Sequence, residues 1–108
     1  MPLSLPPPLE LYVRSENSSN LDALSECFAS NATVRDEGRS YEGLAAIKEW
    51  KAGTKKKYNH TIAPLEVGRH GSKTVLTAQL SGNFPGSPVT LDFSFVLAGG
   101  KIVSLEIH

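Results

Sequence analysis

The chain has 108 residues, of which 40% are hydrophobic and 20% charged, a composition ordinary for one soluble globular domain over residues 1–108. Eleven basic residues balance eleven acidic ones, so the composition gives no electrostatic basis for binding nucleic acid or an anionic membrane. The single cysteine, Cys27, excludes an intramolecular disulfide. With neither a secretory signal nor an apolar run of membrane-spanning length, we expect a cytoplasmic protein.

The first half of the chain predicts three amphipathic helices. The first covers residues 7–17, where three prolines suit its opening turn and Tyr12 and Glu16 share one stripe. Asn20 is the expected N-cap of the second helix, whose buried stripe ends at Phe28. The third covers residues 44–57 and buries Trp50, and Gly53 should loosen its last turn.

A strand over residues 32–37 separates the second and third helices, and a turn is expected over residues 38–43. The two-residue period of the strand places Ala32, Val34 and Asp36 on one side. An acid on a side that begins apolar either marks the solvated end of the strand or faces into a pocket.

The second half predicts antiparallel strands over residues 60–67, 73–82, 87–97 and 101–108, joined by connectors rich in Gly and Pro. Pro64 requires an edge position or a bulge. Val103, Leu105 and Ile107 should share one face of the last strand, with Ile102 on the other.

Helices followed by antiparallel strands predict an α+β domain, in which three N-terminal helices pack on a curved, mostly antiparallel sheet. The interior of such a domain should resemble a cone. The mixed outer face of the sheet favours a homodimer formed through that face. The three histidines, His60, His70 and His108, are too scattered for a metal site, so we expect no metal.

Three segments carry a family resemblance over nearly the whole chain: "NLDALSECFASNATVRDEG", "YEGLAAIKEW" and "FPGSPVTLDFSFVLAGGKIVSLEI". Their order and spacing resemble the SnoaL-like branch of the nuclear-transport-factor-two-like superfamily, which includes polyketide cyclases and is related to ketosteroid isomerase. The resemblance implies a cone-shaped α+β barrel with a pocket between the helices and the sheet. Because this fold hosts many chemistries, the resemblance is more specific for the fold than for the activity.

The resemblance also implies roles for two residues. Asp36 is similar in position to the general base of ketosteroid isomerase, and Tyr12 to its oxyanion-binding tyrosine, a system in which an Asp base works beside an oxyanion hole. Asp36 would take a proton from carbon next to a carbonyl, and Tyr12 would donate a hydrogen bond to the enolate oxygen. The isomerase also has a second, inward acid, for which the candidate here is Asp92. If the apolar face of its strand is the pocket face, alternation turns Asp92 outward and gives the inward position to Phe93, whereas a register shift of one residue would reverse this.

The candidate pocket contains residues from several elements, and each has a purely structural alternative. Tyr12 and Trp50 could equally be core residues, and His60 could lie at the pocket mouth or on the surface. The expected ligand-binding residues are Trp50, Tyr58, His60, Phe93, Phe95 and Leu105.

Two functions are compatible with this pattern. The first is a small protein that binds an apolar or carbonyl-containing molecule and acts without a cofactor as an isomerase or cyclase. The second is a non-catalytic ligand-binding or dimerisation module of the same fold, which the lack of a second inward acid favours.

Overall fold

The computed structural model describes residues 5–18, 21–36 and 38–107. The predicted cap Asn20, Glu37 beside the candidate base, and His108 lie outside the described residues. The elements, in chain order, are α1 (Pro7–Ser18), the 3₁₀ turn η1 (Leu21–Ala23), α2 (Leu24–Cys27), β1 (Phe28–Asp36), β2 (Arg39–Glu42), α3 (Gly43–Tyr58), β3 (Thr61–His70), β4 (Lys73–Ser81), β5 (Val89–Ala98) and β6 (Lys101–Ile107).

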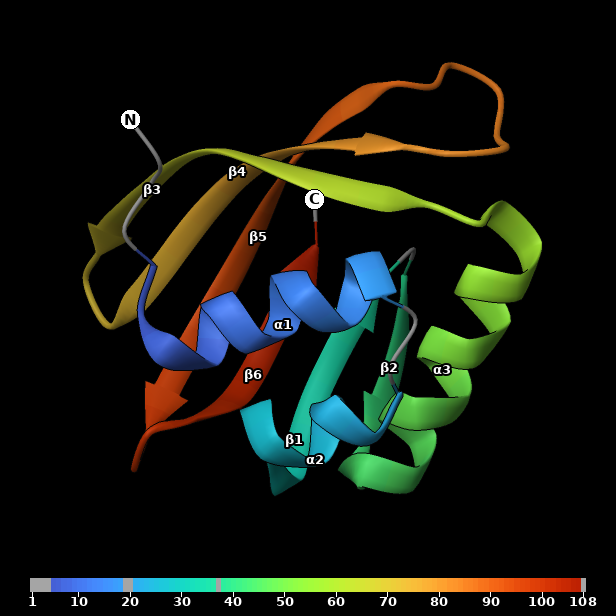
Figure 1. The fold of residues 1–108 in the computed structure, drawn as a ribbon. Coiled ribbons are helices and arrows are strands. Elements are labelled where there is room, and N and C mark those ends of the chain that lie inside the picture. Colours follow the sequence, from blue (N-terminus) through green and yellow to red (C-terminus); the bar gives the residue numbers. More distant parts are fainter. Residues whose placement is uncertain (1–4, 19–20, 37, 108) are drawn as a thin grey trace.

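The fold is α+β, as predicted: helices pack against one face of a curved, open, six-stranded sheet (Figure 1). The strand order is β2-β1-β6-β5-β4-β3, and every neighbouring pair is antiparallel except β1 and β6. The sheet curves over α1, while α3 lies beside β1 and β2 (Figure 1). This arrangement leaves an interior bounded by α1, α3 and the concave face of the sheet.

Aromatic rings from α1 and the sheet form the centre of the core. The Tyr12 ring makes edge contacts with Phe28 and Phe95, at centroid distances of 6.0 and 5.5 Å, and a tilted contact with Phe93 at 6.2 Å. All four side chains are 0–1% exposed. Burial of each such side chain contributes about 1.5–3 kcal/mol, so this cluster holds α1 against the sheet.

Three local predictions were wrong, each for a reason of packing. The second helix is a short turn, because Phe28 already begins β1 and pairs with Ile102 of β6. The expected turn over residues 38–43 contains β2, whose Tyr41 lies opposite Val34 and stacks at 5.9 Å on the Trp50 ring. Ile102 is buried, because a register shift between Val96 and Leu97 changes the alternation of β6.

Pro64 has both of the features that were expected as alternatives, an edge strand and a bulge. Its strand, β3, is an edge of the sheet, and the register of β3 against β4 shifts between Pro64 and Glu66. Asn59 ends α3 in the left-handed conformation with φ 46°, and its N–H donates to the carbonyl of Lys55 at 2.8 Å.

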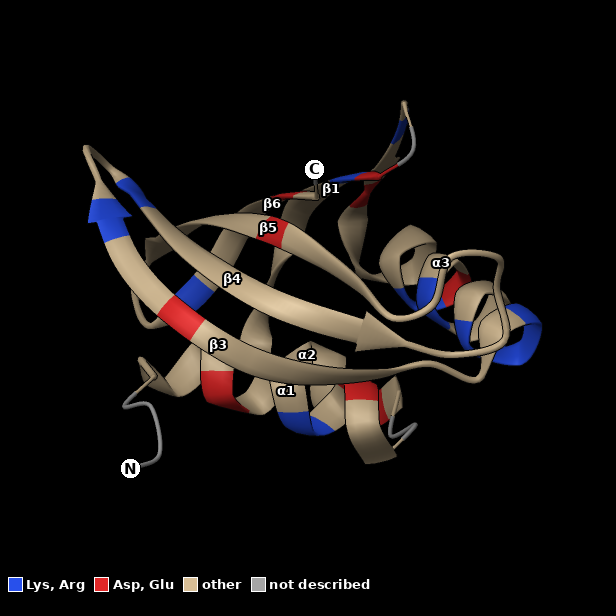
Figure 2. Ribbon diagram, turned by 90° about the horizontal axis from the view of Figure 1, so that it is seen from above, with Lys and Arg blue, Asp and Glu red and all other residues tan. Residues whose placement is uncertain are grey.

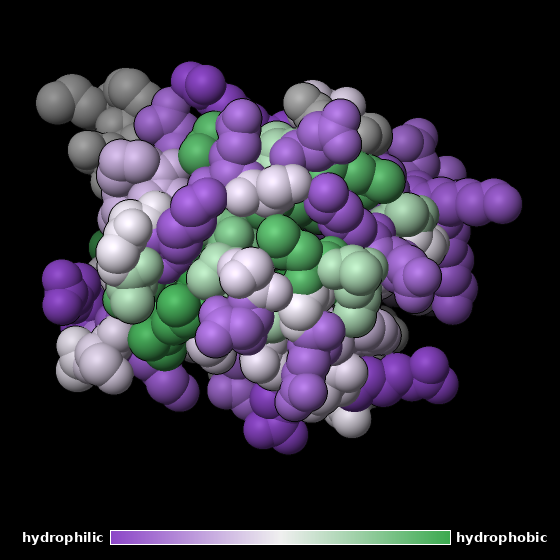
Figure 3. All heavy atoms as spheres, turned by 90° about the horizontal axis from the view of Figure 1, so that it is seen from below, coloured by the Kyte–Doolittle hydropathy of each residue, from purple (hydrophilic) through white to green (hydrophobic). Residues whose placement is uncertain are grey.

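Basic and acidic residues are interspersed over most elements (Figure 2). The exception is the last turn of α3, where three consecutive residues are lysines. On the lower side of the molecule, apolar side chains lie among hydrophilic ones (Figure 3). Within residues 5–18, 21–36 and 38–107, no helix is long and apolar enough to cross a membrane.

Candidate functional site

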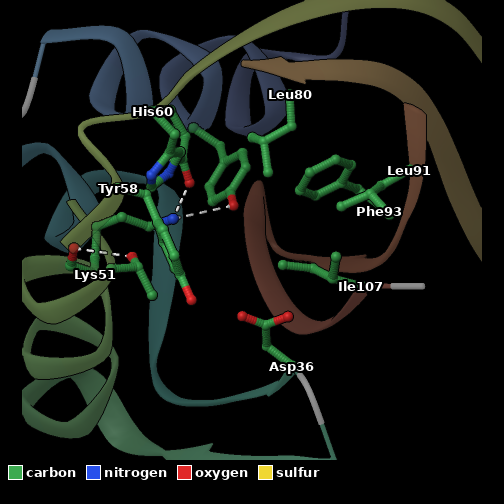
Figure 4. A pocket seen from close by; sticks show the side chains of 11 residues that line it. Asp36, Lys51, Tyr58, His60, Leu80, Leu91, Phe93 and Ile107 are labelled. Atoms are coloured by element: carbon green, nitrogen blue, oxygen red, sulfur yellow. Dashed lines mark hydrogen bonds and ion pairs between the residues drawn. The ribbon is translucent and has the colours of Figure 1, made fainter. Parts of the chain in front are cut away.

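A cavity of about 90 Å³ lies between α1, α3 and the concave face of the sheet (Figure 4). This volume is several times what one buried water needs. Its polar wall comes from the helices, the end of β1 and His60 just before β3, and its apolar wall from β4, β5 and β6. The lining residues are Tyr12, Glu16, Asp36, Lys51, Thr54, Tyr58, His60, Leu80, Leu91, Phe93 and Ile107.

Asp36 reaches the cavity because it follows Ala32 and Val34 on the inner side of β1, at the end where the strand leaves the core. Its carboxylate is half-buried, and its Oδ2 accepts a hydrogen bond from the Trp50 indole Nε1 at 3.0 Å. This bond from α3 orients the carboxylate beside the cavity, so Asp36 is neither a fully solvated strand end nor a fully buried acid.

Tyr12 lies across the cavity from Asp36, and its ring belongs to the aromatic core. Burial raises the pKa of the Tyr12 hydroxyl well above its usual value, and the negative charge of Asp36 adds to this shift. The phenol therefore stays protonated at neutral pH and is available as a hydrogen-bond donor.

A buried ion cluster forms the base of the polar wall. The Glu16 carboxylate contacts Lys51 Nζ through one oxygen and His60 Nε2 through the other, and all three residues are at most 4% exposed. Lys51 Nζ also lies 3.5 Å from the Tyr12 hydroxyl oxygen. The cluster thus connects directly to the candidate donor.

Lys55 supports the cluster from the next turn of α3. Its Nζ contacts the backbone carbonyl of His60 and, at 2.6 Å, that of Glu16. These contacts join the end of α1, α3 and the start of β3 around one group of charges.

Burial and neighbouring cations change the titration of this cluster. Burial, followed by the charges of Lys51 and Lys55, lowers the pKa of His60 to about 4, so the ring is neutral at pH 7 and donates its Nε2–H to Glu16. Burial, followed by Lys55, lowers the pKa of Lys51. Direct contact with the Glu16 carboxylate opposes that shift and favours the ammonium form.

The connection between β4 and β5 contacts Tyr58, which lines the cavity. Phe84 of this connection makes an edge contact with the Tyr58 ring at 5.8 Å, and the Asn83 N–H donates to the Tyr58 carbonyl at 2.7 Å. Gly82 approaches the same backbone closely, because a Cβ there would lie 2.8 Å from the Tyr58 carbonyl oxygen. The connection is therefore anchored to the end of α3.

Comparison with solved structures finds the same fold in several bacterial proteins. A candidate polyketide cyclase from Sinorhizobium meliloti superposes with a TM-score of 0.92 at 42% sequence identity, over 96% of this chain and 95% of that one. The chain belongs to the SnoaL-like branch of the nuclear-transport-factor-two-like superfamily.

Two more distant SnoaL-like and ketosteroid-isomerase-like structures share the fold alone. A protein from Catenulispora acidiphila with a ketosteroid isomerase-like fold, in complex with trimethylamine, has a TM-score of 0.84 at 22% identity, over 97% of this chain and 86% of that one. A candidate SnoaL-like polyketide cyclase from Jannaschia has a TM-score of 0.75 at 17% identity, over 100% and 90% of the two chains. No family model and no curated protein matches the sequence.

The structure of this SnoaL-like chain brings together most of the residues singled out in its sequence. Tyr12, Asp36, Tyr58, His60 and Phe93 line the cavity. The other three expected ligand-binding residues lie behind its walls: Trp50 contacts Asp36, while Phe95 and Leu105 are in the core. The Tyr12 ring packs against Phe95 at a centroid distance of 5.5 Å, on the side of the core away from the lining residues.

The sequence analysis did not assign two charged residues, Glu16 and Lys51, to the cavity, although the pattern of each helix pointed to their burial. Glu16 shares the apolar stripe of its helix with Tyr12, four residues earlier, and Lys51 follows Ile47 by four on the buried face of α3. A charge on an apolar stripe predicts a buried partner, but nothing local identifies that partner.

Asp92 lies on the outer face, where it accepts a hydrogen bond from Thr77 at 2.9 Å. In the part of the chain that the structure describes, no three His, Cys, Asp or Glu side chains gather as metal ligands.

Proposed function

We propose that this chain binds a small, mostly apolar carbonyl compound in its cavity and catalyses a cofactor-free proton transfer next to the carbonyl, giving isomerisation or cyclisation. The observation that carries the proposal is that the Asp36 carboxylate and the Tyr12 hydroxyl line one cavity whose remaining sheet wall is apolar. These groups are the two that enolate chemistry requires.

In this mechanism, Asp36 is the base. Its carboxylate removes a proton from the carbon next to the carbonyl, and the electron pair moves into the enolate. The Trp50 indole, which donates to Oδ2, keeps the carboxylate turned toward the cavity during this transfer. Protonation of a different carbon by the resulting acid gives the isomer. Attack of the enolate carbon on a second carbonyl closes a ring, and the alkoxide that forms takes the proton back from Asp36.

Tyr12 stabilises the charge that develops on the ligand oxygen. Because its pKa is raised, the hydroxyl donates a hydrogen bond to the enolate oxygen and does not lose its proton. Leu80, Leu91 and Phe93 form an apolar wall that limits the access of water, which strengthens this hydrogen bond relative to one in solution.

The test follows proton exchange in D₂O by NMR, using a panel of β,γ-unsaturated ketones and 1,3-dicarbonyl compounds. Replacing the base, in Asp36→Asn, should lower the enzyme-dependent exchange rate by about a hundredfold or more. The matched control is Asp92→Asn, which removes an acid from the outer face and should exchange at the wild-type rate. Equal rates in wild type and Asp36→Asn would refute Asp36 as the base.

The second candidate function is a non-catalytic ligand-binding module. The outward position of Asp92 favours it, because the isomerase-type oxyanion hole contains a second, inward acid. Saturable binding of the panel compounds without exchange above the buffer rate would support this module over the enzyme.

A further inference from the structure

We infer that Lys51 is a positioning residue that directs the Tyr12 hydroxyl proton into the cavity. The inference rests on the proposed function, which assigns Tyr12 as the donor to the ligand oxygen. It adds a residue from outside the pair of Asp36 and Tyr12 and gives the buried ion cluster a role in ligand binding.

The direction of the hydrogen bond follows from the chemistry of the two groups. A lysine ammonium has three N–H donors and no acceptor, whereas a phenol oxygen can both accept and donate. With Lys51 Nζ held by Glu16 and 3.5 Å from the Tyr12 oxygen, the phenol oxygen is the acceptor of that contact. The Tyr12 proton must then lie elsewhere, and the cavity adjoins the hydroxyl.

The same ammonium should help Tyr12 as the reaction proceeds. When the phenol donates to a ligand oxyanion, negative charge increases on the phenol oxygen, and a nearby cation stabilises that charge in a buried site. The contact is long in the unliganded protein, and such bonds commonly shorten when the ligand binds. Lys51 Nζ also lies 4.0 Å from the centroid of the Trp50 ring, whose N–H orients Asp36.

The surroundings of Lys51 hold its ammonium in one place. Glu16 balances its charge, and His60 occupies the second Glu16 oxygen. The Lys55 ammonium is bound to the carbonyls of Glu16 and His60. A lysine that merely neutralised Glu16 would need no contact with Tyr12, so the two roles differ in what they predict for an anionic ligand.

The experiment compares two probes of similar shape, the anion of 4-nitrophenol and the neutral nitrobenzene. The nitrophenolate absorbance reports how much of the probe binds as the anion, and nitrobenzene reports the apolar cavity alone. In the variant Glu16→Gln/Lys51→Met, which removes both charges together, we expect nitrophenolate affinity to fall about tenfold and nitrobenzene affinity to stay within about twofold. Lys56→Met, which removes an exposed ammonium from the same helix, should bind both probes like wild type.

Three results would overturn the role of Lys51. An equal loss of both probes would mean a structural role, and tighter nitrophenolate binding would mean that Tyr12 donates to Lys51. An equal loss of nitrophenolate affinity in Lys56→Met would mean that only the general positive field of α3 matters. If the double variant does not fold, Glu16→Gln/Lys51→Gln keeps a polar pair at these positions and should lose about threefold in nitrophenolate affinity.

Tyr12→Phe separates this inference from the proposed function. Suppose that Tyr12→Phe binds nitrophenolate more weakly while the double variant binds it like wild type. That result would refute the positioning role of Lys51 and leave the donor role of Tyr12 intact. Unchanged binding in Tyr12→Phe, or no binding by wild type, would refute the donor role of Tyr12 and the inference with it.

Discussion

Glu16 illustrates, at the scale of the residue, how a buried charge is tolerated in this protein. Its side chain lies on the inner face of α1 and contacts a lysine from α3 and a histidine preceding β3. Taking an ion pair out of water costs several kcal/mol per ion, which close contact and additional hydrogen bonds must offset. The cluster as a whole therefore adds little to the net free energy of unfolding. Each charged residue in it nevertheless needs its partner, because removing one leaves the other buried and unpaired.

This dependence predicts how substitutions of the pair combine. Lys51→Met should lower the free energy of unfolding by about 3–5 kcal/mol, because it leaves Glu16 buried without its cation. Glu16→Gln/Lys51→Met should lose less than Lys51→Met alone, because no unbalanced charge remains in the interior. Urea denaturation of the single and double variants measures both values, and a double variant less stable than Lys51→Met would contradict the prediction.

The titration of His60 predicts how stability depends on pH. Its pKa falls from 6.5 in the unfolded chain to about 4 in the folded protein, so between these values the unfolded state binds more protons. The free energy of unfolding should therefore be unaffected by this group above pH 6.5 and should fall by about 2–3 kcal/mol as the pH is lowered toward 4.

Urea denaturation between pH 4 and pH 7 measures this effect, with His60→Gln as the control. Glutamine retains a donor for Glu16 but does not titrate in this range, so its stability should change less with pH. The assignment to His60 would fail if wild type and His60→Gln had parallel pH profiles.

At the scale of the element, local patterns predicted the helices and strands because each element presents one apolar face. Both α1 and α3 lie within about one residue of their predicted bounds. The failures occur where an element has little periodicity of its own. β2 has four residues and forms only because β1 offers it a partner, and α2 is short because Phe28 packs better as part of a strand.

Two glycines, Gly82 and Gly53, should respond oppositely to the same substitution. Gly82→Ala should lower the free energy of unfolding by about 1–3 kcal/mol, because its Cβ would lie 2.8 Å from the Tyr58 carbonyl oxygen and 3.0 Å from His60 Cα. Gly53→Ala should raise it by about 0.5–1 kcal/mol, because Gly53 is an exposed helical residue with open space around it.

Thermal or urea denaturation distinguishes these two effects, and each variant serves as the other's control. A stable Gly82→Ala protein would mean that the connection between β4 and β5 moves readily away from α3. In that event, the connection would be less firmly anchored to Tyr58 than its contacts indicate.

At the scale of the whole molecule, we expect two copies to associate through the outer face of the sheet. Alternation turns Val75 of β4 and Val96 of β5 outward, with Ser94 opposite Val75 and Lys73 opposite Val96. Figure 2 views this side of the sheet, where charges are sparse along the centre of β4. A face of this composition is compatible with burial against a second copy.

Val75→Arg should therefore shift the protein from dimer to monomer, because it places a charge at the centre of the expected interface. Ala52→Arg, on the exposed side of α3, is the matched control and should not change the oligomeric state. Sedimentation velocity measures both, and a monomeric wild type would exclude the dimer at the concentrations used.

The sequence by itself determined the α+β class, the two long helices, most of the sheet and the side of β1 that Asp36 shares with Ala32 and Val34, while its place beside the cavity came from the structure. These features follow from the apolar periodicity of each segment, which is a local property. Only the tertiary structure decided which charges meet, since Lys51 and His60 lie 35 and 44 residues from Glu16 along the chain. It also decided that Trp50 orients Asp36 and that Phe95 and Leu105 lie behind the cavity, because such contacts depend on how the packed elements approach one another and not on the pattern within any one of them.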